Sequence, residues 1–500
     1  MTLRRYERYK DSGVEWLGAV PAHWDVLQLR RVIDRIEQGW SPECENRPAE
    51  EGEWGVLKTG CVNGGRFNPL ENKALPSQLE APPELEVAPN DLLMSRASGS
   101  PELVGSAALV NDTPPRLLLS DKTFRLHVNQ RVDKQFLAWC LGSRLLRAQI
   151  ECAISGAAGL ANNLPQASLV EFASPFPPVH EQRAIAAYLN RETTKIDALI
   201  VEQQRLIELL NEKRQAVIAH SVTKGLNPAA PMKDSGVEWL GKVPSHWEVA
   251  RLGRFATVRS GYAFPSTGFS LDDMETRLLR GINVGVGALR WDEVVYWKRQ
   301  PDDGLDAFAL SAGDVVLGMD RPFVGDGTRV ARISAADLPC LLLQRVASIH
   351  PSPGLLPGYL IELLESSLFV HHIGPETTGV SVPHISPGQV CDFRVPVPPI
   401  SEQLGIVRMI EEAVGKTEAL TSDASTAVAL LLERRTALIS AAVTGQIDVR
   451  NSASVESALA ETRADIAAGR YVVESAAAHV ARVQAMATAD EHPSAPPRSC

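Results

Sequence analysis

Two long stretches of the chain carry apolar residues at heptad spacing. In the first, the repeating positions and the leucines between them are Leu189, Ile196, Gln203, Leu210 and Val217, with Leu199 and Leu206. The second stretch has the same spacing with more alanine: Ile410, Thr417, Ala424, Leu431 and Leu438, with Ala413, Leu420 and Ala427. The pattern predicts two long helices that pack along an a/d seam, bulky residues against small ones. A solvated helical hairpin inside one domain is the alternative interpretation.

Both helices have start and stop signals. Pro177-Pro178 and Pro398-Pro399 precede them, and Gly225 and Gly445 follow them. Because proline is not tolerated in a helix interior and glycine is common just after a helix, these residues bracket about 40 helical residues, or roughly 60 Å.

Mixed patterns fill the segments before each helix. Apolar runs at 117–126 and 339–349, bounded by turn residues, predict strands. Helical spacing appears at 134–150 and 357–372. We therefore expect a mixed α/β fold in which two tandem globular domains are joined by two long helices, packed as an antiparallel coiled coil.

An internal repeat organises the whole chain. Residues 10–32 and 233–255 are identical at 16 of 23 positions, including the block SGVEWLG-x-VP-x-HW. The helix entries at 176–189 and 397–410 and the helix ends at 213–225 and 434–446 also match. Between these matched ends the two copies diverge. Such a repeat indicates one structural unit used twice.

The repeat sets the predicted boundaries. They are 1–178 for a first globular domain, 179–232 for a central helix and linker, 233–400 for a second globular domain, 401–449 for a distal helix, and 450–500 for an Ala-rich, partly disordered tail. The tryptophans of the repeated block could stack on bases, but buried structural anchors are the favoured interpretation.

Composition narrows the class of protein. The chain has 500 residues, 44% of them hydrophobic and 22% charged, and a net charge of -10. The seven cysteines form no CxxC pair, which is typical of reduced thiols rather than of disulfides or a zinc site. The beginning of the chain has no apolar stretch after its basic residues, so we expect a cytoplasmic protein without a secretory signal.

The sequence contains no recognisable motif for nucleotide binding, methyl transfer or metal binding. The run GVEWLGK at 236–242 has the spacing of a phosphate-binding loop, but Val243 stands where such a loop needs Ser or Thr. The sequence contains no Asn-Pro-Pro-aromatic or Asp-Pro-Pro-aromatic motif of amino-methyltransferases. His371, His372 and His384 are more typical of helix ends or loops than of metal ligands. We expect a non-catalytic chain that holds no metal or cofactor.

The repeated SGVEWLG-x-VP-x-HW block, the PP-x-x-EQ helix entry and the matched helix ends resemble the specificity subunit of type I restriction-modification systems. The resemblance extends from about residue 10 to 449 and occurs twice. It implies two target recognition domains for double-stranded DNA and helices that dock two methyltransferase (modification) subunits, joined by restriction subunits for cleavage. S-adenosylmethionine, ATP and magnesium would then belong to the partners. The tail after about residue 450 departs from the pattern.

The repeat also suggests how DNA is read. Antiparallel helices would give the two domains a pseudo-twofold relation, and roughly 60 Å is close to two turns of DNA. We expect a split, asymmetric target with one half-site per domain. Candidate base-reading residues lie in the divergent segments, and for each of them a solvated surface charge is the alternative. They are Lys58, Arg66, Arg96, Ser98, Lys122 and Asn163 in the first domain, and Arg280, Asn283, Arg290, Arg321, Arg329, Gln344 and His384 in the second.

Two rival functions remain open. A scaffold that joins two partners without reading DNA would suit the acidic charge, although a scaffold gives no reason for the two middles to diverge. A fused enzyme is disfavoured by the missing motifs. Arg96 and Arg321 are the strongest DNA-reading candidates, because each follows a matched Asp-containing strand.

Overall fold

The computed structural model describes residues 5–154, 162–324, 327–377 and 384–450. The chain divides into two compact units, which are considered separately. Unit 1 comprises Met1–Leu199 and Leu430–Cys500, and unit 2 comprises Ile200–Ala429. Each unit therefore combines one globular segment with parts of both long helices. The predicted Ala-rich tail lies outside the described residues, apart from Arg450.

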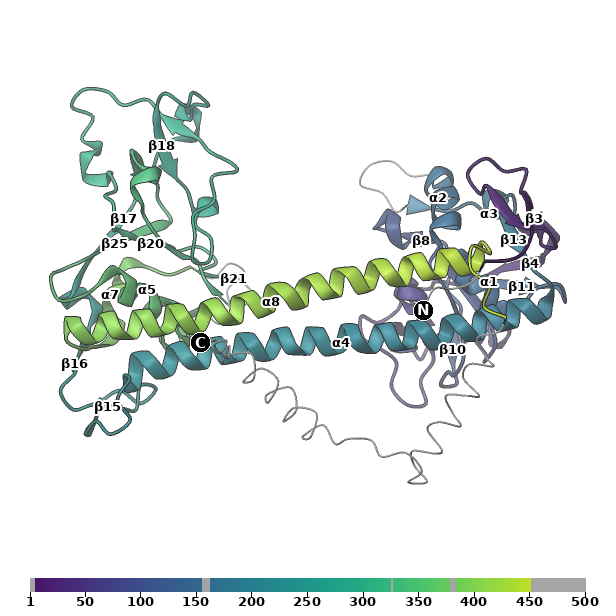
Figure 1. Cartoon of the computed structure of the whole chain (residues 1–500), viewed down its shortest axis with the longest axis horizontal. Coiled ribbons are helices and arrows are strands. Elements are labelled where there is room, and N and C mark those ends of the chain that lie inside the picture. Colours follow the sequence, from purple (N-terminus) through teal and green to yellow (C-terminus); the bar gives the residue numbers. More distant parts are fainter. Residues whose placement is uncertain (1–4, 155–161, 325–326, 378–383, 451–500) are drawn as a thin grey trace, which may run out of the picture. The chain divides into compact units, whose positions relative to one another are not determined.

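Unit 1 is built on a four-stranded antiparallel sheet of order β4-β11-β7-β9, of which β4 and β11 are labelled in Figure 1. A three-stranded sheet of order β10-β5-β6 has β10 parallel to β5, and the pairs β1-β2, β3-β13 and β8-β12 complete the unit. The strands are β1 (Tyr9–Asp11), β2 (Ala19–Pro21), β3 (Asp25–Gln28), β4 (Ile33–Gln38), β5 (Gly55–Leu57), β6 (Asn72–Ala74), β7 (Leu92–Ser95), β8 (Ala97–Ser98), β9 (Ala107–Leu109), β10 (Leu117–Leu118), β11 (Thr123–Val128), β12 (Asn162–Asn163) and β13 (Ala173–Phe176).

Unit 2 repeats this topology. Its four-stranded sheet has the order β17-β25-β20-β23, and its three-stranded sheet β19-β18-β24 again contains one parallel pair. The pairs β14-β15 and β16-β26 correspond to β1-β2 and β3-β13. The strands are β14 (Met232–Asp234), β15 (Lys242–Pro244), β16 (Glu248–Arg251), β17 (Ala256–Ser260), β18 (Thr276–Leu279), β19 (Tyr296–Trp297), β20 (Val315–Gly318), β21 (Phe323–Val324), β22 (Gly327–Thr328), β23 (Val330–Arg332), β24 (Cys340–Leu342), β25 (Val346–Pro351) and β26 (Arg394–Val397).

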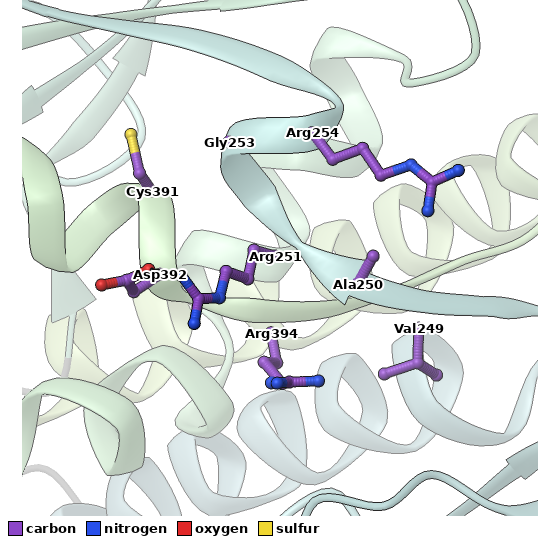
Figure 2. A pocket seen from close by; sticks show the side chains of 8 residues that line it. All are labelled: Val249, Ala250, Arg251, Gly253, Arg254, Cys391, Asp392 and Arg394. Atoms are coloured by element: carbon purple, nitrogen blue, oxygen red, sulfur yellow. Dashed lines mark ion pairs between the residues drawn. The ribbon is translucent and has the colours of Figure 1, made fainter.

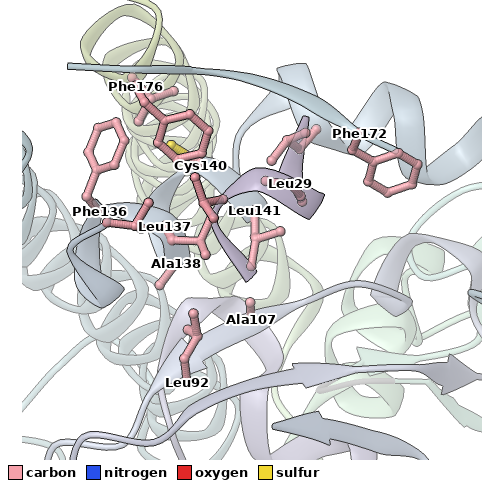
Figure 3. Packing of buried hydrophobic residues seen from close by; sticks show 14 of the residues in the cluster. Leu29, Leu92, Ala107, Phe136, Leu137, Ala138, Cys140, Leu141, Phe172 and Phe176 are labelled. Atoms are coloured by element: carbon pink, nitrogen blue, oxygen red, sulfur yellow. The ribbon is translucent and has the colours of Figure 1, made fainter. Parts of the chain in front are cut away.

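Among the described residues of each unit, three short α-helices accompany the strands. They are α1 (Lys134–Leu141), α2 (Arg144–Ala153) and α3 (Gln166–Leu169) in unit 1, and α5 (Pro357–Glu365), α6 (Ser367–Thr377) and α7 (Pro387–Asp392) in unit 2. The helix predicted at 134–150 is thus two helices, because Ser143 accepts a hydrogen bond from the amide of Leu146 and starts α2 anew. In Figure 3, Phe136, Leu137 and Leu141 of α1 pack with Leu29, Leu92 and Phe176.

The two long helices are α4 (Val179–Lys224) and α8 (Ile400–Val443). In unit 1 the start of α4 and the end of α8 share one core, to which Leu189 and Ile439 belong. In unit 2 the end of α4 and the start of α8 share another, with Ile218 and Ile410. The two helices therefore pair antiparallel within each unit. This arrangement confirms the predicted mixed α/β fold with an antiparallel coiled coil.

The predicted seam is half right. The first heptad position is buried at Ile196 and Leu210 and half-buried at Gln203 and Val217, whereas Leu199, Leu206 and Leu420 are exposed by 52%, 41% and 52%. Ile200, four residues after Ile196, is buried instead of Leu199. The residues three and four positions after a seam residue lie on opposite sides of the seam. Both are apolar here, so the sequence pattern predicted burial of Leu199 where Ile200 is buried.

The repeated sequence blocks meet around a buried carboxylate in unit 1. Glu181, 1% exposed, accepts hydrogen bonds from the Tyr6 hydroxyl at 2.5 Å and from Trp24 Nε1 at 3.2 Å, and it lies 2.9 Å from His23 Nε2. Burial, then the contact with Glu181, raises the pKa of Tyr6. Glu181 is the Glu of PP-x-x-EQ and Trp24 the Trp of HW, so these blocks form one structural joint.

Unit 2 repeats the His–Glu contact of this joint, with His246 Nε2 at 2.8 Å from Glu402 and with Trp247 buried, but among the described residues the Trp247 indole has no hydrogen-bond partner. The Gln of each PP-x-x-EQ motif binds backbone groups. Gln182 accepts from the amide of Asp133, and Gln403 accepts from the amide of Leu356. The HW tryptophans are therefore buried anchors, whereas Trp16 is 50% exposed.

Candidate nucleic-acid interface

Four of the predicted residues of unit 1 come together at one end of its four-stranded sheet. β8 follows β7 directly and pairs with β12, so that Ser98 lies opposite Asn162 and Ala97 opposite Asn163. The amide of Arg96 donates to the carbonyl of Lys122 at 2.8 Å. We call Arg96, Ser98, Lys122 and Asn163 the unit 1 patch.

The side chains of the unit 1 patch are partly exposed. Arg96 Nη1 donates to the carbonyl of Asp121 at 3.2 Å, and the same carbonyl accepts from Gln38 Nε2 at 2.8 Å. Lys122 is exposed, and Ser98 and Asn163 are half-buried. A guanidinium, an ammonium, a hydroxyl and an amide are thus offered from one short stretch of surface. These groups can bind phosphates and the acceptor edges of bases.

The equivalent place in unit 2 is defined by the same backbone hydrogen bonds. The amide of Met319 donates to the carbonyl of Arg345, as Arg96 does to Lys122, and the amide of Ile385 donates to Met319, as Leu164 does to Arg96. Asp320 lies opposite His384, as Ala97 lies opposite Asn163. The resulting equivalences are Arg96 with Met319, Ala97 with Asp320, Ser98 with Arg321, Asp121 with Gln344, Lys122 with Arg345, and Asn163 with His384.

Arg96 and Arg321 each follow a matched strand, but they are not equivalent to each other, since Arg96 corresponds to Met319. Arg321 matches Ser98, two positions along the chain. We call Asp320, Arg321, Gln344, Arg345 and His384 the unit 2 patch. The backbone hydrogen bonds of the two patches are equivalent, whereas their side chains differ.

The sequence prediction missed Asp320 and Arg345. Asp320 Oδ1 lies 2.7 Å from His384 Nδ1 and 3.0 Å from Arg345 Nη1, so one carboxylate oxygen joins two other members of the unit 2 patch. The side chains of Asp320, Arg345 and His384 are 37%, 56% and 41% exposed. The repeat offset of 223 residues leads from Lys122 to Arg345 and could have identified it.

Three predicted residues form contacts with loops or helices of their own unit. Asn283 is 1% exposed, and its Nδ2 donates to the carbonyls of Arg290 and Glu293, so its assignment as a base reader was wrong. Arg66 Nη2 binds Asp197 of α4 at 2.7 Å. Arg329 donates to the carbonyls of Val284 and Asp320, and burial lowers its pKa.

The remaining predicted residues lie outside the two patches. Lys58 Nζ lies 3.1 Å from Glu71, and Arg280 Nη2 donates to the carbonyl of Glu293 at 2.8 Å. Lys58 and Arg280 are equivalent, since each precedes a short 3-10 helix and accepts at its carbonyl from the residue three positions on. Arg290 is exposed.

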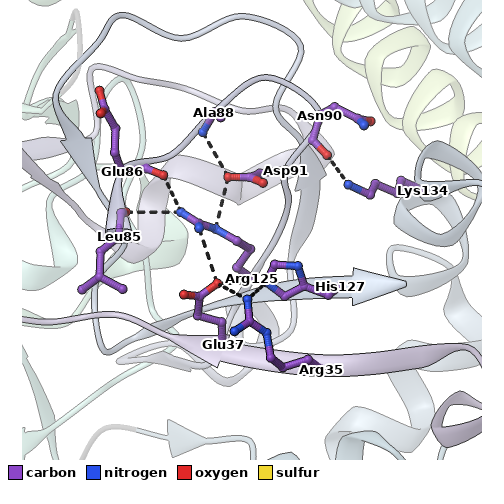
Figure 4. Close-up of polar contacts among 10 residues, drawn as sticks. All are labelled: Arg35, Glu37, Leu85, Glu86, Ala88, Asn90, Asp91, Arg125, His127 and Lys134. Atoms are coloured by element: carbon purple, nitrogen blue, oxygen red, sulfur yellow. Dashed lines mark hydrogen bonds and ion pairs between the residues drawn. The ribbon is translucent and has the colours of Figure 1, made fainter. Parts of the chain in front are cut away.

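A buried arginine distinguishes the interior of unit 1 from that of unit 2. Arg125, 8% exposed, lies 3.1 Å from Asp91 and 3.4 Å from Glu37 and donates to the carbonyls of Leu85 and Glu86 (Figure 4). Burial acts to raise the pKa of Glu37, but His127, Arg125 and Arg35 stabilise the carboxylate, and the pKa lies below its usual value.

The equivalent position in unit 2 is Ser348, because β11 and β25 have matching registers. Asp314, the counterpart of Asp91, instead lies 2.7 Å from His350. The copies therefore differ in their interior as well as in their patches.

A second basic surface of unit 2 lies away from its patch. Arg251, Arg254 and Arg394 surround a hollow of about 490 Å³, where Arg251 pairs with Asp392 at 2.9 Å (Figure 2). β17 begins beside Arg254 and ends two residues before Tyr262, whose carbonyl accepts from the amide of Gln344 in the patch. The hollow and the patch therefore lie at opposite ends of β17.

Within the described ranges, no helix is long and apolar enough to span a bilayer, and no group of three or more His, Cys, Asp or Glu side chains is arranged to hold a metal ion.

The chain is similar to several curated proteins. It is 31% identical to the type I restriction enzyme EcoAI specificity subunit of Escherichia coli over 239 residues, which are 48% of this chain and 40% of that protein. It is 26% identical to the type I restriction enzyme MjaVIII specificity subunit of Methanocaldococcus jannaschii over 404 residues, 78% of this chain and 86% of that protein. The match thus spans less than half of the first relative and most of the second. No family model matches the chain.

The fold has a counterpart among solved structures. A chain from a structure concerned with complex assembly and conformational transition of the type I R-M system superposes with a TM-score of 0.62, at 17% identity, over 85% of this chain and 98% of that one. The resemblance expected from the repeated blocks is therefore confirmed: the chain is similar in sequence to specificity subunits of type I restriction enzymes, and its fold is similar to that of a chain from a solved type I R-M structure.

Proposed function

We propose that this chain is the non-catalytic, cytoplasmic DNA-reading subunit of a type I restriction-modification complex, and that it binds a two-part asymmetric target with one half-site per unit. One observation carries the proposal. The unit 1 patch and the unit 2 patch occupy the same place in a duplicated fold and differ at each of their equivalent side chains. A duplicated reader of two different half-sites requires this combination.

The chemistry of the patches suits major-groove reading. Arginine and lysine donate to guanine O6 and N7, and asparagine pairs with the N6 and N7 of adenine. The net charge of -10 does not oppose this, because these side chains are grouped locally and because partner subunits can contribute phosphate contacts.

The proposed docking sites for two modification subunits are the outer faces of α4 and α8. Among the described residues, several leucines of these helices are exposed by about half, and exposed apolar residues that lie together are typical of protein interfaces. They are Leu199, Leu206 and Leu209 on α4, and Leu420, Leu430 and Leu432 on α8. In this proposal S-adenosylmethionine binds the modification subunits, and ATP with magnesium binds restriction subunits that join them.

The same leucines favour a second candidate function. A scaffold that joins two partners through α4 and α8 would need these leucines, and it would tolerate an acidic surface. It would give no sequence preference on DNA.

The test uses the chain co-expressed with its modification subunits. Duplexes enriched from a random library by the complex should contain two short fixed sequences with a spacer of constant length. A variant with one heptad inserted in both α4 and α8 should enrich the same half-sites with a longer spacer. Altered half-sites in the insertion variant would contradict the proposal, and absence of enrichment by the wild type would favour the scaffold.

A further inference from the structure

An exposed carboxylate lies at the centre of the unit 2 patch. Asp320 is held between His384 and Arg345, both of which contact its Oδ1. Its backbone pairs with that of His384, and its carbonyl accepts from Arg329 Nη1 at 2.8 Å, so both the main chain and the side chain of Asp320 are fixed. The acid is therefore held in place and remains 37% exposed.

A carboxylate on a surface that meets DNA needs a specific partner there. It repels the phosphates, so it weakens binding unless it accepts a hydrogen bond from a base. In the major groove the exocyclic amino groups of cytosine and adenine are the donors, and Asp or Glu accepting from cytosine N4 is an established pairing. Arg345 beside it supplies donors for guanine O6 and N7.

The pair of side chains matches one base pair better than the other. Across the major groove a G·C pair presents two acceptors on guanine and then a donor on cytosine. An A·T pair presents the acceptor N7, the donor N6 and then the acceptor O4 of thymine. With Arg345 over the purine, Asp320 would meet the cytosine amino group in the first case and the O4 oxygen of thymine in the second, where two acceptors oppose each other.

Unit 1 lacks this combination at the same place. Ala97 stands at the position of Asp320, Lys122 at that of Arg345, and Asn163 at that of His384. An alanine cannot accept from cytosine. Because the backbone is equivalent in the two units, these side-chain differences would change which base pair each unit prefers.

We propose that Asp320 and Arg345 together read one G·C pair in the half-site of unit 2, with Asp320 accepting from cytosine N4 and Arg345 donating to guanine, while His384 positions the carboxylate. This inference rests on the proposed function. It adds the identity of one base pair and two specificity residues that the sequence prediction did not contain.

The first experiment uses the complex of the chain with its modification subunits and a random duplex library. The wild type should enrich an invariant G·C pair in one half-site. Asp320→Ala and the closer mimic Asp320→Asn should relax that position by about 5- to 150-fold and leave the other half-site unchanged, since a good base contact contributes roughly 1–3 kcal/mol of discrimination. Asp306→Asn is the matched control, because Asp306 also pairs with an arginine, Arg299, in unit 2 but lies outside the patch.

The second experiment separates direct reading from an indirect effect through Arg345. N4-methylcytosine places a methyl group on the major-groove side of the amino group, and 7-deazaguanine removes N7. The first substitution should weaken the wild type and Arg345→Ala but not Asp320→Ala. The second should weaken the wild type and Asp320→Ala but not Arg345→Ala. If N4-methylcytosine weakens Asp320→Ala as much as the wild type, Asp320 acts only through Arg345 and the inference is overturned.

Failure of this inference is distinguishable from failure of the proposed function. A wild-type complex that enriches two half-sites without an invariant G·C pair, or an Asp320→Ala complex with the wild-type preference, overturns the inference alone. A wild-type complex that enriches no sequence overturns both. Thermal unfolding of each variant confirms that the complexes compared are folded.

Discussion

Oε2 of Glu181 lies 2.9 Å from Nε2 of His23, and this contact joins the beginning of α4 to the block that precedes β3. Glu181→Ala would leave the buried hydroxyl of Tyr6 and the indole of Trp24 without their acceptor. We expect a loss of about 2–4 kcal/mol of unfolding free energy, measured by urea denaturation. Glu402→Ala is the matched comparison, because the Glu402 side chain is 24% exposed, and it should cost less. Equal losses would contradict this account of the joint.

Arg125 is expected to be the most sensitive charged residue of unit 1. Arg125→Ala would leave Asp91 and Glu37 without their shared cation, which costs about 3–5 kcal/mol for a buried pair. Arg35→Ala is the control, since the Arg35 side chain is 65% exposed and should contribute less than about 1 kcal/mol. Thermal or urea unfolding of both variants measures the difference. Similar effects would show that Arg125 is not central to the core.

The pH dependence of unit 2 should involve Glu362 of α5. Burial, then Glu365, raises its pKa from 4.5 to about 8. The folded chain keeps the Glu362 carboxyl protonated to a higher pH than the unfolded chain does. The contribution of this carboxyl to the free energy of unfolding is therefore fully present below about pH 4.5 and is lost as the pH rises through about 8.

Glu362→Gln should therefore raise the Tm of unit 2 near pH 8 and flatten its decline between about pH 5 and 9. Thermal unfolding followed across this range is the measurement. Glu412→Gln, on the exposed surface of α8, provides a control that should not flatten the decline. An unchanged slope in Glu362→Gln would rule out Glu362 as its source.

The seam and the outer leucines of α4 should respond differently to truncation. Leu210→Ala removes a buried side chain and should cost about 2–5 kcal/mol in the isolated chain. Leu206→Ala should change the stability of the isolated chain by less than about 0.5 kcal/mol but weaken the binding of modification subunits. Urea denaturation and a binding titration measure the two effects. Loss of stability without loss of binding in Leu206→Ala would place that leucine in the seam after all.

The sequence predicted the large features because they depend on repetition and periodicity. The bounds of α4 and α8 follow from the proline pairs and from Gly225 and Gly445, and the duplicated topology follows from the repeat. The seam phase did not follow, because Leu199 and Ile200 are both apolar and only packing shows which one is covered.

The site was predictable only in part for a similar reason. Arg96, Ser98, Lys122 and Asn163 come together through hydrogen bonds between distant strands, as do Arg321, Gln344 and His384. Asn283 has a side chain of the type that reads bases, but its Nδ2 donates hydrogen bonds to two backbone carbonyls. No sequence pattern indicates these hydrogen bonds. Asp320 was not predicted, because a carboxylate repels DNA phosphates and only the structure shows that His384 and Arg345 lie beside it.

The most direct test of the central claim is the set of duplexes enriched by the complex when only the unit 1 patch is changed. We expect Arg96→Ala with Lys122→Ala to relax or alter one half-site and to leave the other half-site and the spacer as in the wild type. The control variant replaces three arginines outside both patches and should alter neither half-site. Its substitutions are Arg251→Ala, Arg254→Ala and Arg394→Ala. Simultaneous change of both half-sites, or no change in either, would contradict the claim that each unit reads its own half of the target.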